Sequence, residues 1–289
     1  MRAISKPQHA QGVFLLILTT AIWGTSFPLL KGMLGDLPAP IILASRFTVA
    51  AIAFSPYLRH LNPKLLRDGA ILGAFIFGEC LLALLGLETI SANRSAFLIS
   101  LNVILVPLFG TILGRKLPKR IVVAVGIAIA GITILSWEGG GFGIGDLLTL
   151  SCAIGIACYI LAMEVITPKH PTLSLVAVQL TVAALLAIFW ALLNGNTSFA
   201  GSIPYLSTLL YLGLIVTAVP IWTQTQAQRW ISASEAALLY TLEPVFASIF
   251  SFIWLHEALG IRGYVGAALI LSATLISQFP SKRLAETHS

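Results

Sequence analysis

The sequence predicts an all-α membrane protein of ten transmembrane helices, arranged as two inverted-topology repeats of five helices, and three observations lead to this fold class. The first is composition: of 289 residues, 57% are hydrophobic and only 10% are charged, with a mean hydropathy of +0.94. A soluble domain carries about 25% charged residues. This chain therefore has too little polar material to coat a water-facing surface. The other two observations are a series of apolar runs and an internal repeat.

Apolar runs of about 20 residues, the length that a spanning helix needs, follow one another along the chain. Their approximate limits are 12–33, 40–58, 68–89, 92–114, 119–136, 145–166, 172–193, 205–228, 232–254 and 262–279. The connections between them are short and hold the prolines, glycines and charges that are typical of helix ends. No connection is long enough to hold a soluble domain.

The positions of lysine and arginine predict the orientation, because cytoplasmic loops retain an excess of these residues. With the N-terminus inside, only Lys31, Arg94 and Arg262 fall on the outer side, and most of the others fall on the inner side. Both termini are therefore expected in the cytoplasm, with the protein in the cytoplasmic (inner) membrane of a bacterium. The net charge of +6 is divided among short clusters without interleaved aromatics, so no nucleic-acid partner is expected.

An internal repeat divides the chain into a first half, 1–139, and a second half, 140–289, which together form one compact membrane domain. Residues 90–96 (ISANRSA) recur 141 positions later as 231–237 (ISASEAA), and two shorter matches keep the same order. Each half holds five helices. Because five is odd, the second half enters the membrane from the opposite side. Transporters use such inverted repeats to build two mirror-related access states around a midplane site.

Short motifs in the first and ninth helices resemble those of a known family. They are residues 21–28 (AIWGTSFP), 232–244 (SASEAALLYTLEP) and 255–257 (LHE), followed by the small residues Gly263, Gly266 and Ala267. They resemble the EamA-type ten-helix transporters of the drug/metabolite transporter superfamily, and the whole chain is similar to amino-acid exporters of the YddG type. The resemblance implies export of small metabolites. The first half departs from the pattern, with Asn102 in place of Glu243.

Three ionisable side chains lie at membrane depth, where each costs at least about 2.5–3.5 kcal/mol. Arg46 lies in the second run, and Glu79 and Glu243 lie near the middles of the third and ninth. In one interpretation they are substrate or coupling groups in a water-filled cavity. In the other they are structural, as a pair of Arg46 with Glu79 or as neutral acids bonded to backbone. Gln179 occupies the repeat-equivalent position of Arg46 and favours a shared architectural role. The sequence is compatible both with transport coupled to protons and with uniport.

Aromatic side chains at helical spacing predict a pocket for a small substrate. Pairs such as Trp23 with Phe27, and Tyr240 with Glu243, share a helix face. Rings would stack an apolar group while polar side chains hold an amino or carboxyl end. The alternative is that the rings only pack or face lipid. The expected lining is Trp23, Phe27, Phe75, Glu79, Asn102, Tyr159, Trp222, Tyr240 and Glu243.

Prolines inside four runs break the backbone hydrogen-bond ladder and free carbonyl groups that can face a cavity. These positions are expected either as hinges of a rocking motion or as static kinks. They are Pro28, with Gly24 beside it, Pro107, Pro220 and Pro244.

The sequence holds no motif for a cofactor, a metal or catalysis. Cys80, Cys152 and Cys158 lie in apolar runs without the spacing of a zinc site. The glycine-rich residues 139–145 lack the lysine of a phosphate-binding loop.

The function expected is therefore a secondary transporter, not an enzyme. It would carry small metabolites by alternating access, and amino acids are the favoured class of substrate. Its partners would be a small-molecule substrate and the lipid bilayer; it would act as a monomer, with no ATPase subunit. The alternative is a membrane-embedded enzyme or flippase that acts on a lipid or lipid-linked substrate.

Overall fold

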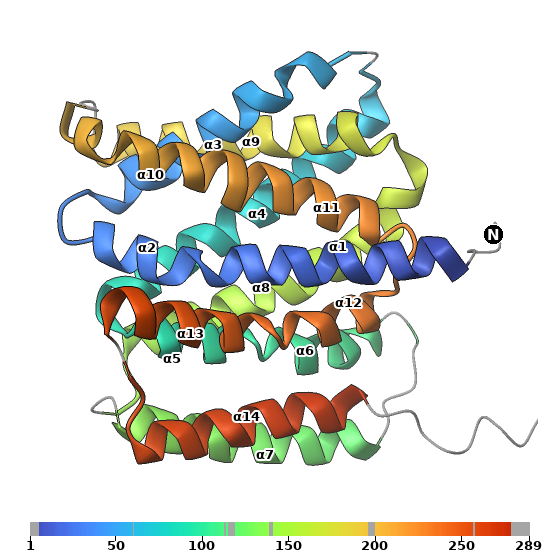
Figure 1. Cartoon of the computed structure of the whole chain (residues 1–289). Coiled ribbons are helices and arrows are strands. Elements are labelled where there is room, and N and C mark those ends of the chain that lie inside the picture. The colour runs from blue at the N-terminus through green and yellow to red at the C-terminus, as the bar shows by residue number, and fades with distance from the viewer. Residues whose placement is uncertain are drawn as a thin grey trace, which may run out of the picture.

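The protein is a bundle of α-helices in the part of the chain that the computed structural model describes, which is residues 6–59, 61–112, 114, 119–138, 141–195, 200–256 and 258–278. These residues include no β-strand. The helices run side by side in layers, and the described chain begins and ends at the same end of the bundle (Figure 1). The end that holds the start of α1 is called the His9 end below, and the opposite end the Arg94 end.

The first half of the bundle is built from α1 (Lys6–Gly24), α2 (Ser26–Met33), α3 (Ala39–Phe54), α4 (Pro63–Thr89), α5 (Ala92–Ile99), α6 (Asn102–Gly110) and α7 (Lys119–Glu138). The second half is built from α8 (Ile144–Ile166), α9 (Thr172–Leu193), α10 (Leu206–Tyr211), a π-helical segment (Leu212–Ala218), α11 (Val219–Ala227), α12 (Ala233–Tyr240), α13 (Glu243–Leu255) and α14 (Ile261–Gln278). Short 3₁₀ turns cover Ser55–Tyr57, Thr167–Lys169 and Ala200–Tyr205.

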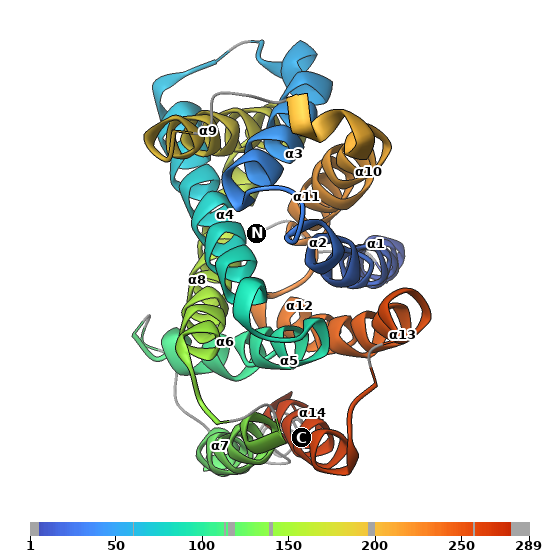
Figure 2. The same ribbon diagram turned by 90° about the vertical axis from the view of Figure 1, so that its left-hand side faces the viewer.

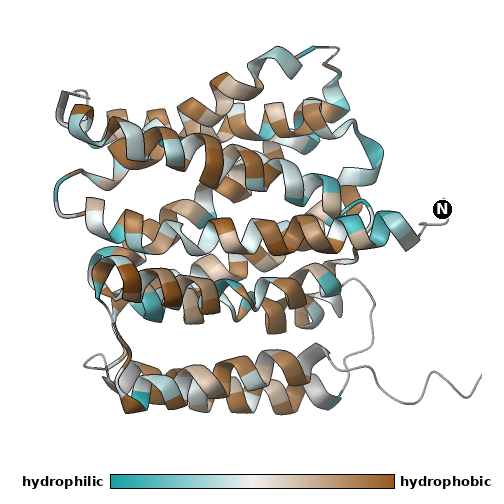
Figure 3. Ribbon diagram, in the orientation of Figure 1, coloured by the Kyte–Doolittle hydropathy of each residue, from teal (hydrophilic) through white to brown (hydrophobic). Residues whose placement is uncertain are grey.

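Eight segments of the described chain are long and apolar enough to cross a membrane, which confirms the prediction of an all-helical, multi-pass membrane protein. They are Pro7–Met33, Ala39–Tyr57, Pro63–Thr89, Ala92–Gly110, Ile144–Lys169, Thr172–Leu193, Gly201–Ala227 and Ala233–Leu255. Shorter apolar stretches, Val122–Leu135 and Ile261–Ala273, lie within α7 and α14. The count of ten spans stays a prediction at these two helices. Apolar residues follow the helices, and hydrophilic ones gather mainly in the turns at the two ends (Figure 3).

Glycines let two pairs of helices cross with their backbones in contact. A Cβ atom on Gly131 of α7 would lie 2.9 Å from the carbonyl oxygen of Gly266 on α14. On α4, a Cβ atom on Gly73 would lie 2.6 Å from the carbonyl oxygen of Gln179 on α9. Small residues at such crossings are the usual means of close packing in membranes. In Figure 2, α7 and α14 form a pair to one side of the other helices.

Three of the spans are broken near their middles. α1 gives way to α2 at Thr25, α5 to α6 at residues 100–101, and α12 to α13 at Thr241. At two breaks the backbone N–H bonds to the carbonyl three residues back, from Thr25 to Ile22 and from Thr241 to Leu238, at 3.1 Å each. The threonine hydroxyl donates to that same carbonyl at 2.7 Å in both cases. Broken helices are tolerated at membrane depth only where protein or a water-filled cavity surrounds them.

The helices α5 and α12 begin alike. The hydroxyl of Ser91 accepts from the N–H of Arg94 at 3.2 Å, and the hydroxyl of Ser232 accepts from the N–H of Glu235 at 3.3 Å. These N-caps satisfy helix-end donors that have no partner within the helix. The two serines are 141 positions apart, which is the offset of the sequence repeat. The inverted relation between the halves stays a prediction.

Candidate functional site

A cavity lies inside the bundle, where the broken spans meet α3, α4, α8 and the π-helical segment. The centre of a water molecule can occupy about 100 Å³ of this cavity, and the lining is mostly apolar. Roughly 10–15 Å³ of such space already holds one water molecule. The cavity therefore has room for several waters or for a small solute.

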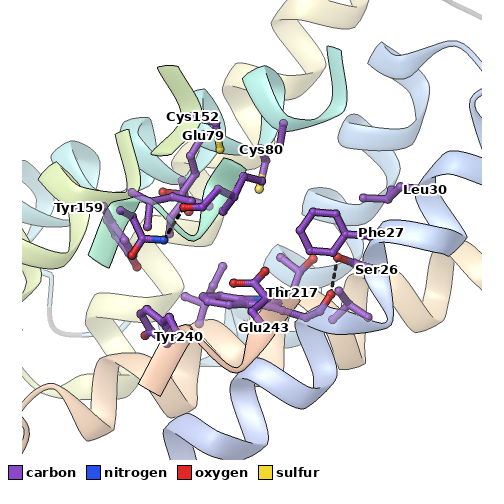
Figure 4. Close-up of a pocket in the computed structure, with 18 of the residues that line it drawn as sticks. Ser26, Phe27, Leu30, Glu79, Cys80, Cys152, Tyr159, Thr217, Tyr240 and Glu243 are labelled. Carbon is purple, nitrogen blue, oxygen red and sulfur yellow. Dashed lines mark hydrogen bonds between the residues drawn. The ribbon is translucent and has the colours of Figure 1, made fainter. Parts of the chain in front are cut away.

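Eight of the side chains predicted to form a site lie together in this lining. They are Trp23, Phe27, Arg46, Glu79, Asn102, Tyr159, Tyr240 and Glu243. In Figure 4, Glu79 and Glu243 approach the cavity from opposite sides. Sequence positions more than 160 residues apart are thus brought to one place by the fold.

Three predicted residues lie elsewhere. Trp222 is 39% exposed on the outside of the bundle, and Phe75 packs against the apolar core beside the cavity. Gln179 is fully buried behind the lining, where its Oε1 accepts a hydrogen bond from the hydroxyl of Tyr159 at 2.9 Å. Gln179 is therefore placed to orient a cavity residue rather than to contact a ligand.

The breaks place the first residues of three helices in the lining. Ser26 begins α2, Asn102 begins α6 and Glu243 begins α13, and each of them lines the cavity. Ser26 donates its hydroxyl hydrogen to the carbonyl of Trp23 at 2.7 Å, and Asn102 Nδ2 donates to the carbonyl of Ile99 at 2.8 Å. These two side chains donate to backbone carbonyl groups at the breaks. The Oδ1 atom of Asn102 is buried and has no hydrogen-bond partner among the described residues.

The break positions follow from the prolines in two of these spans. A proline has no N–H to donate to the residue four positions earlier. For Pro28 that residue is Gly24, and for Pro244 it is Tyr240, each directly before its break. For Pro220 it is Val216, inside the π-helical segment. Pro107 instead lies within α6, several residues after the break that precedes that helix.

Gly24 has a second role that the structure makes visible. A Cβ atom at this position would lie 2.5 Å from the Cβ of Phe246 on α13. The lack of a side chain lets the end of α1 touch α13 just past the break between α12 and α13. Gly24 therefore brings two broken spans into backbone contact beside the cavity.

The carboxyl groups of Glu79 and Glu243 have no hydrogen-bond partner among the described residues, and the Oε2 atom of Glu79 is fully buried. The pairing of Arg46 with Glu79, considered as a structural alternative, is not formed within the 4.0 Å of an ion pair. The lining therefore holds separate polar groups that do not neutralise one another by direct contact.

Two aromatic rings pack together in the wall of the cavity. Trp23 and Tyr240 lie with ring centroids 5.6 Å apart and planes tilted by 51°. Tyr240 is 1% exposed, and its hydroxyl has no partner. This geometry is typical of a packed aromatic pair that still offers one polar atom to the cavity.

Several lining residues were missed from the sequence, including the polar side chains Ser26, Cys80, Cys152, Thr217 and Gln224. Helical spacing could have identified some of them, because residues seven positions apart lie on the same face of a helix. Thr217 and Gln224 are seven residues apart on one face, as are Cys152 and Tyr159. On α4 the face that enters the cavity is Ile76, Glu79, Cys80 and Ala83, rather than the face that contains Phe75.

No group of three or more His, Cys, Asp or Glu side chains in the described part of the chain is placed to hold a metal ion. The three cysteines are free thiols. The lining offers charged groups, hydrogen-bonding groups and apolar surface for the binding of a solute.

The chain is similar to known proteins over nearly its whole length. The model of the EamA-like transporter family matches it twice, over residues 10–137 and 143–278. An uncharacterized transporter of Archaeoglobus fulgidus is 30% identical over 263 residues, which cover 90% of this chain and 83% of that protein. A probable terminal-alkyne amino-acid exporter of Streptantibioticus cattleyicolor is 25% identical and covers 92% of this chain and 93% of its own length.

A solved crystal structure has the same fold. It matches with a TM-score of 0.69 at 19% identity, covering 93% of this chain and 96% of that one. At 19% identity, this similarity supports the fold but not the function.

Proposed function

The chain belongs to the EamA-like transporter family, and from this premise we propose that it is a secondary carrier that exports amino acids by alternating access. The descriptions of the family and of the relatives name transporters, not enzymes. The alternative of a membrane-embedded enzyme is therefore set aside. The proposal concerns the cargo, the mechanism and the direction.

The observation that carries the proposal is the cavity at the three helix breaks. Carriers place their substrate sites near the membrane midplane, on discontinuous helices whose ends point at the substrate. Here Ser26, Asn102 and Glu243 each begin a helix at the cavity wall. Breaks of this kind supply polar groups at a depth where an unbroken helix offers only side chains.

Amino acids are the proposed cargo because the lining combines charged and apolar groups in a small space. Arg46, Glu79 and Glu243 provide charge, and Trp23 and Phe27 provide apolar surface. The amino-acid exporter among the relatives supports the same class of substrate. We further propose that the protein acts as a monomer in a bacterial inner membrane, with both termini in the cytoplasm, as the distribution of lysine and arginine favours.

The test is counterflow in proteoliposomes. Purified protein is reconstituted, the vesicles are loaded with one unlabelled amino acid, and uptake of the same labelled amino acid is followed with and without a pH gradient. Saturable uptake of unchanged amino acid, accelerated by internal amino acid, is expected for a carrier. Flux that does not saturate would overturn the carrier mechanism, and no uptake of any amino acid would overturn the cargo.

Substitutions at the two carboxyl groups connect the activity to the cavity. Glu79→Gln and Glu243→Gln are expected to lower uptake, and loss of pH dependence in one of them would identify a coupling residue. Glu88→Gln is the matched control, because Glu88 lies on the same helix as Glu79 but is exposed. Equal effects of all three substitutions would contradict a site at this cavity.

A further inference from the structure

Arg46 is a buried arginine that forms no direct ion pair with the described residues. Its side chain is 6% exposed and lines the cavity. Its only hydrogen bond among the described residues runs from Nε to the hydroxyl oxygen of Thr217, at 2.8 Å. No carboxylate of the described residues lies within the 4.0 Å of an ion pair. Both terminal nitrogens of the guanidinium are therefore left without a partner among the residues that the structure describes.

The surrounding structure holds Arg46 in this position. Thr217 donates its own hydroxyl hydrogen to the carbonyl of Leu212 at 2.7 Å, so that its oxygen is free to accept from Arg46. Gly213 lets the π-helical segment reach α3, because a Cβ atom there would lie 3.0 Å from the carbonyl oxygen of Arg46. The guanidinium carbon also lies 5.5 Å from the centre of the Phe47 ring. Arg46 is thus fixed at Nε and open at its two other nitrogens.

A guanidinium does not lose its charge in proteins. Burying such a charge without a partner is strongly unfavourable, whereas a paired and hydrogen-bonded charge is tolerated. The planar fork of the two terminal nitrogens fits a carboxylate with two parallel hydrogen bonds. The missing partner of Arg46 is therefore expected to come from a ligand in the cavity.

The same cavity also holds buried oxygen atoms, which can accept hydrogen bonds. The Oε2 atom of Glu79, the Oδ1 atom of Asn102, the Oε1 atom of Gln224 and the hydroxyl of Tyr240 have no hydrogen-bond partner in the described part of the chain. The amide oxygens of Asn102 and Gln224 are acceptors only, and the carboxyl group of Glu79 is an acceptor only when it is ionised. Buried acceptors without partners need donors, which an ammonium group supplies. One ligand that carries both a carboxylate and an ammonium would satisfy both sets.

We propose that Arg46 binds the carboxylate of the transported amino acid, while the acceptor group of Glu79, Asn102, Gln224 and Tyr240 binds its ammonium. This inference rests on the proposed function and specifies how the cargo is held. It makes a free carboxylate, and not only an amine, the requirement for transport. It also assigns a ligand role to a residue whose sequence position had favoured a structural one.

The test compares three ligands that differ in one charge. Leucine has both groups, leucinamide lacks the carboxylate, and 4-methylpentanoate lacks the ammonium. Each is used at increasing concentration to inhibit counterflow of labelled leucine in proteoliposomes. For the wild type, leucinamide and 4-methylpentanoate are each expected to inhibit at least about thirtyfold less well than leucine, as for removal of one partner of a buried charge pair.

The variants locate the effect. Arg46→Gln is expected to weaken inhibition by leucine at least about thirtyfold and to leave inhibition by leucinamide within about threefold of the wild type, since leucinamide has no carboxylate to lose. Arg46→Lys, which keeps the charge without the fork, is expected to retain part of the preference for leucine. Arg59→Gln removes an exposed arginine beyond the end of α3 and serves as the matched control.

The outcomes separate this inference from the proposed function. Saturable counterflow of leucine with equal inhibition by leucinamide would overturn the role of Arg46 and leave the carrier standing. An equal loss for both ligands in Arg46→Gln would do the same. No counterflow of leucine or of any other amino acid would overturn the proposed cargo and this inference together. The comparison of ligands on the wild type needs no variant, so the test holds even if Arg46→Gln fails to fold.

Discussion

The helices α5 and α12 start with the same serine cap, but the charged residue that follows the cap forms a different kind of ion pair at each end of the bundle. Arg94 follows the Ser91 cap and pairs with Asp146 at the start of α8, with two contacts of 2.7 Å. Glu235 follows the Ser232 cap and pairs with His9 at the start of α1, at 2.9 Å. The side chains of the first pair are 6% and 1% exposed, and those of the second are 47% and 50% exposed.

The difference in burial decides what each pair contributes. A bidentate pair out of water is costly to break, because each separated charge would be left without solvent or partner. An exposed pair is worth about 0–1 kcal/mol, because water replaces either partner. Under the proposed alternating access, we therefore expect the His9 end to open at lower cost than the Arg94 end.

The largest effect is expected from Asp146→Ala, which leaves Arg94 buried and unpaired. It should reduce the free energy of unfolding by about 3–5 kcal/mol, measured by thermal or denaturant unfolding in detergent. The Oδ2 atom of Asp146 also accepts from the N–H of Gly143 at 2.8 Å, which adds to the loss. The double variant Arg94→Met with Asp146→Leu should recover much of it, since no charge is then stranded. A change below 1 kcal/mol in Asp146→Ala would contradict the contrast between the ends.

A buried pair at the His9 end sharpens the comparison. The ring nitrogen Nε2 of His170 lies 2.8 Å from Oδ2 of Asp68, and both side chains are under one-tenth exposed. This pair joins α4 to the start of α9, and not α12 to α1. Asp68→Asn is expected to cost about 1–3 kcal/mol of unfolding free energy, read from the same unfolding experiment. Arg67→Gln removes an exposed contact to Oδ1 of Asp68, at 3.0 Å from a side chain that is 75% exposed, and should cost no more than about 1 kcal/mol.

Access to the cavity tests directly which end opens. Cys80 and Cys152 line the cavity, and Cys158 does not. In a Cys158→Ser background, a membrane-impermeant thiol reagent should label the cavity cysteines at least about tenfold faster from the His9 side, a factor that corresponds to 1.4 kcal/mol. A variant with all three cysteines replaced by serine gives the background. Equal rates from both sides would remove the proposed asymmetry.

The smallest effect is expected from His9→Gln, which removes the exposed contact and leaves the cap of α12 intact. The free energy of unfolding should change by no more than about 1 kcal/mol, while thiol labelling from the His9 side rises. The unfolding and labelling measurements above are repeated on this variant. A loss above 2 kcal/mol would show that the exposed pair is as important as the buried one.

Much of the fold could be predicted from the sequence, because a membrane forces apolar runs of fixed length. The runs ending near Met33 and Thr89 agree with the spans of the structure to within a few residues. Periodicity also identified the face of α1 and α2 that bears Trp23 and Phe27. It failed for Phe75, because a side chain that faces a cavity and one that faces the core are both apolar in such a helix.

The unpaired state of Arg46 could not be predicted. The sequence allowed a pair with Glu79, since both lie at membrane depth. In the structure Arg46 is fixed instead by Thr217, a residue 171 positions away on a π-helical turn. A single polar side chain in an apolar span gives no sign of the helix that it meets, so only the packing of α3 against this segment reveals the open guanidinium.

By itself the sequence determined that this protein lies in a membrane, where its apolar spans run and which prolines lie near the breaks of two spans. These properties depend on composition and on the local backbone. The tertiary structure alone decided which breaks meet, which charges stay unpaired and which of the two serine caps is followed by a buried ion pair. Those properties depend on contacts between residues far apart in the chain, and their free energies are set by burial, which no local pattern records.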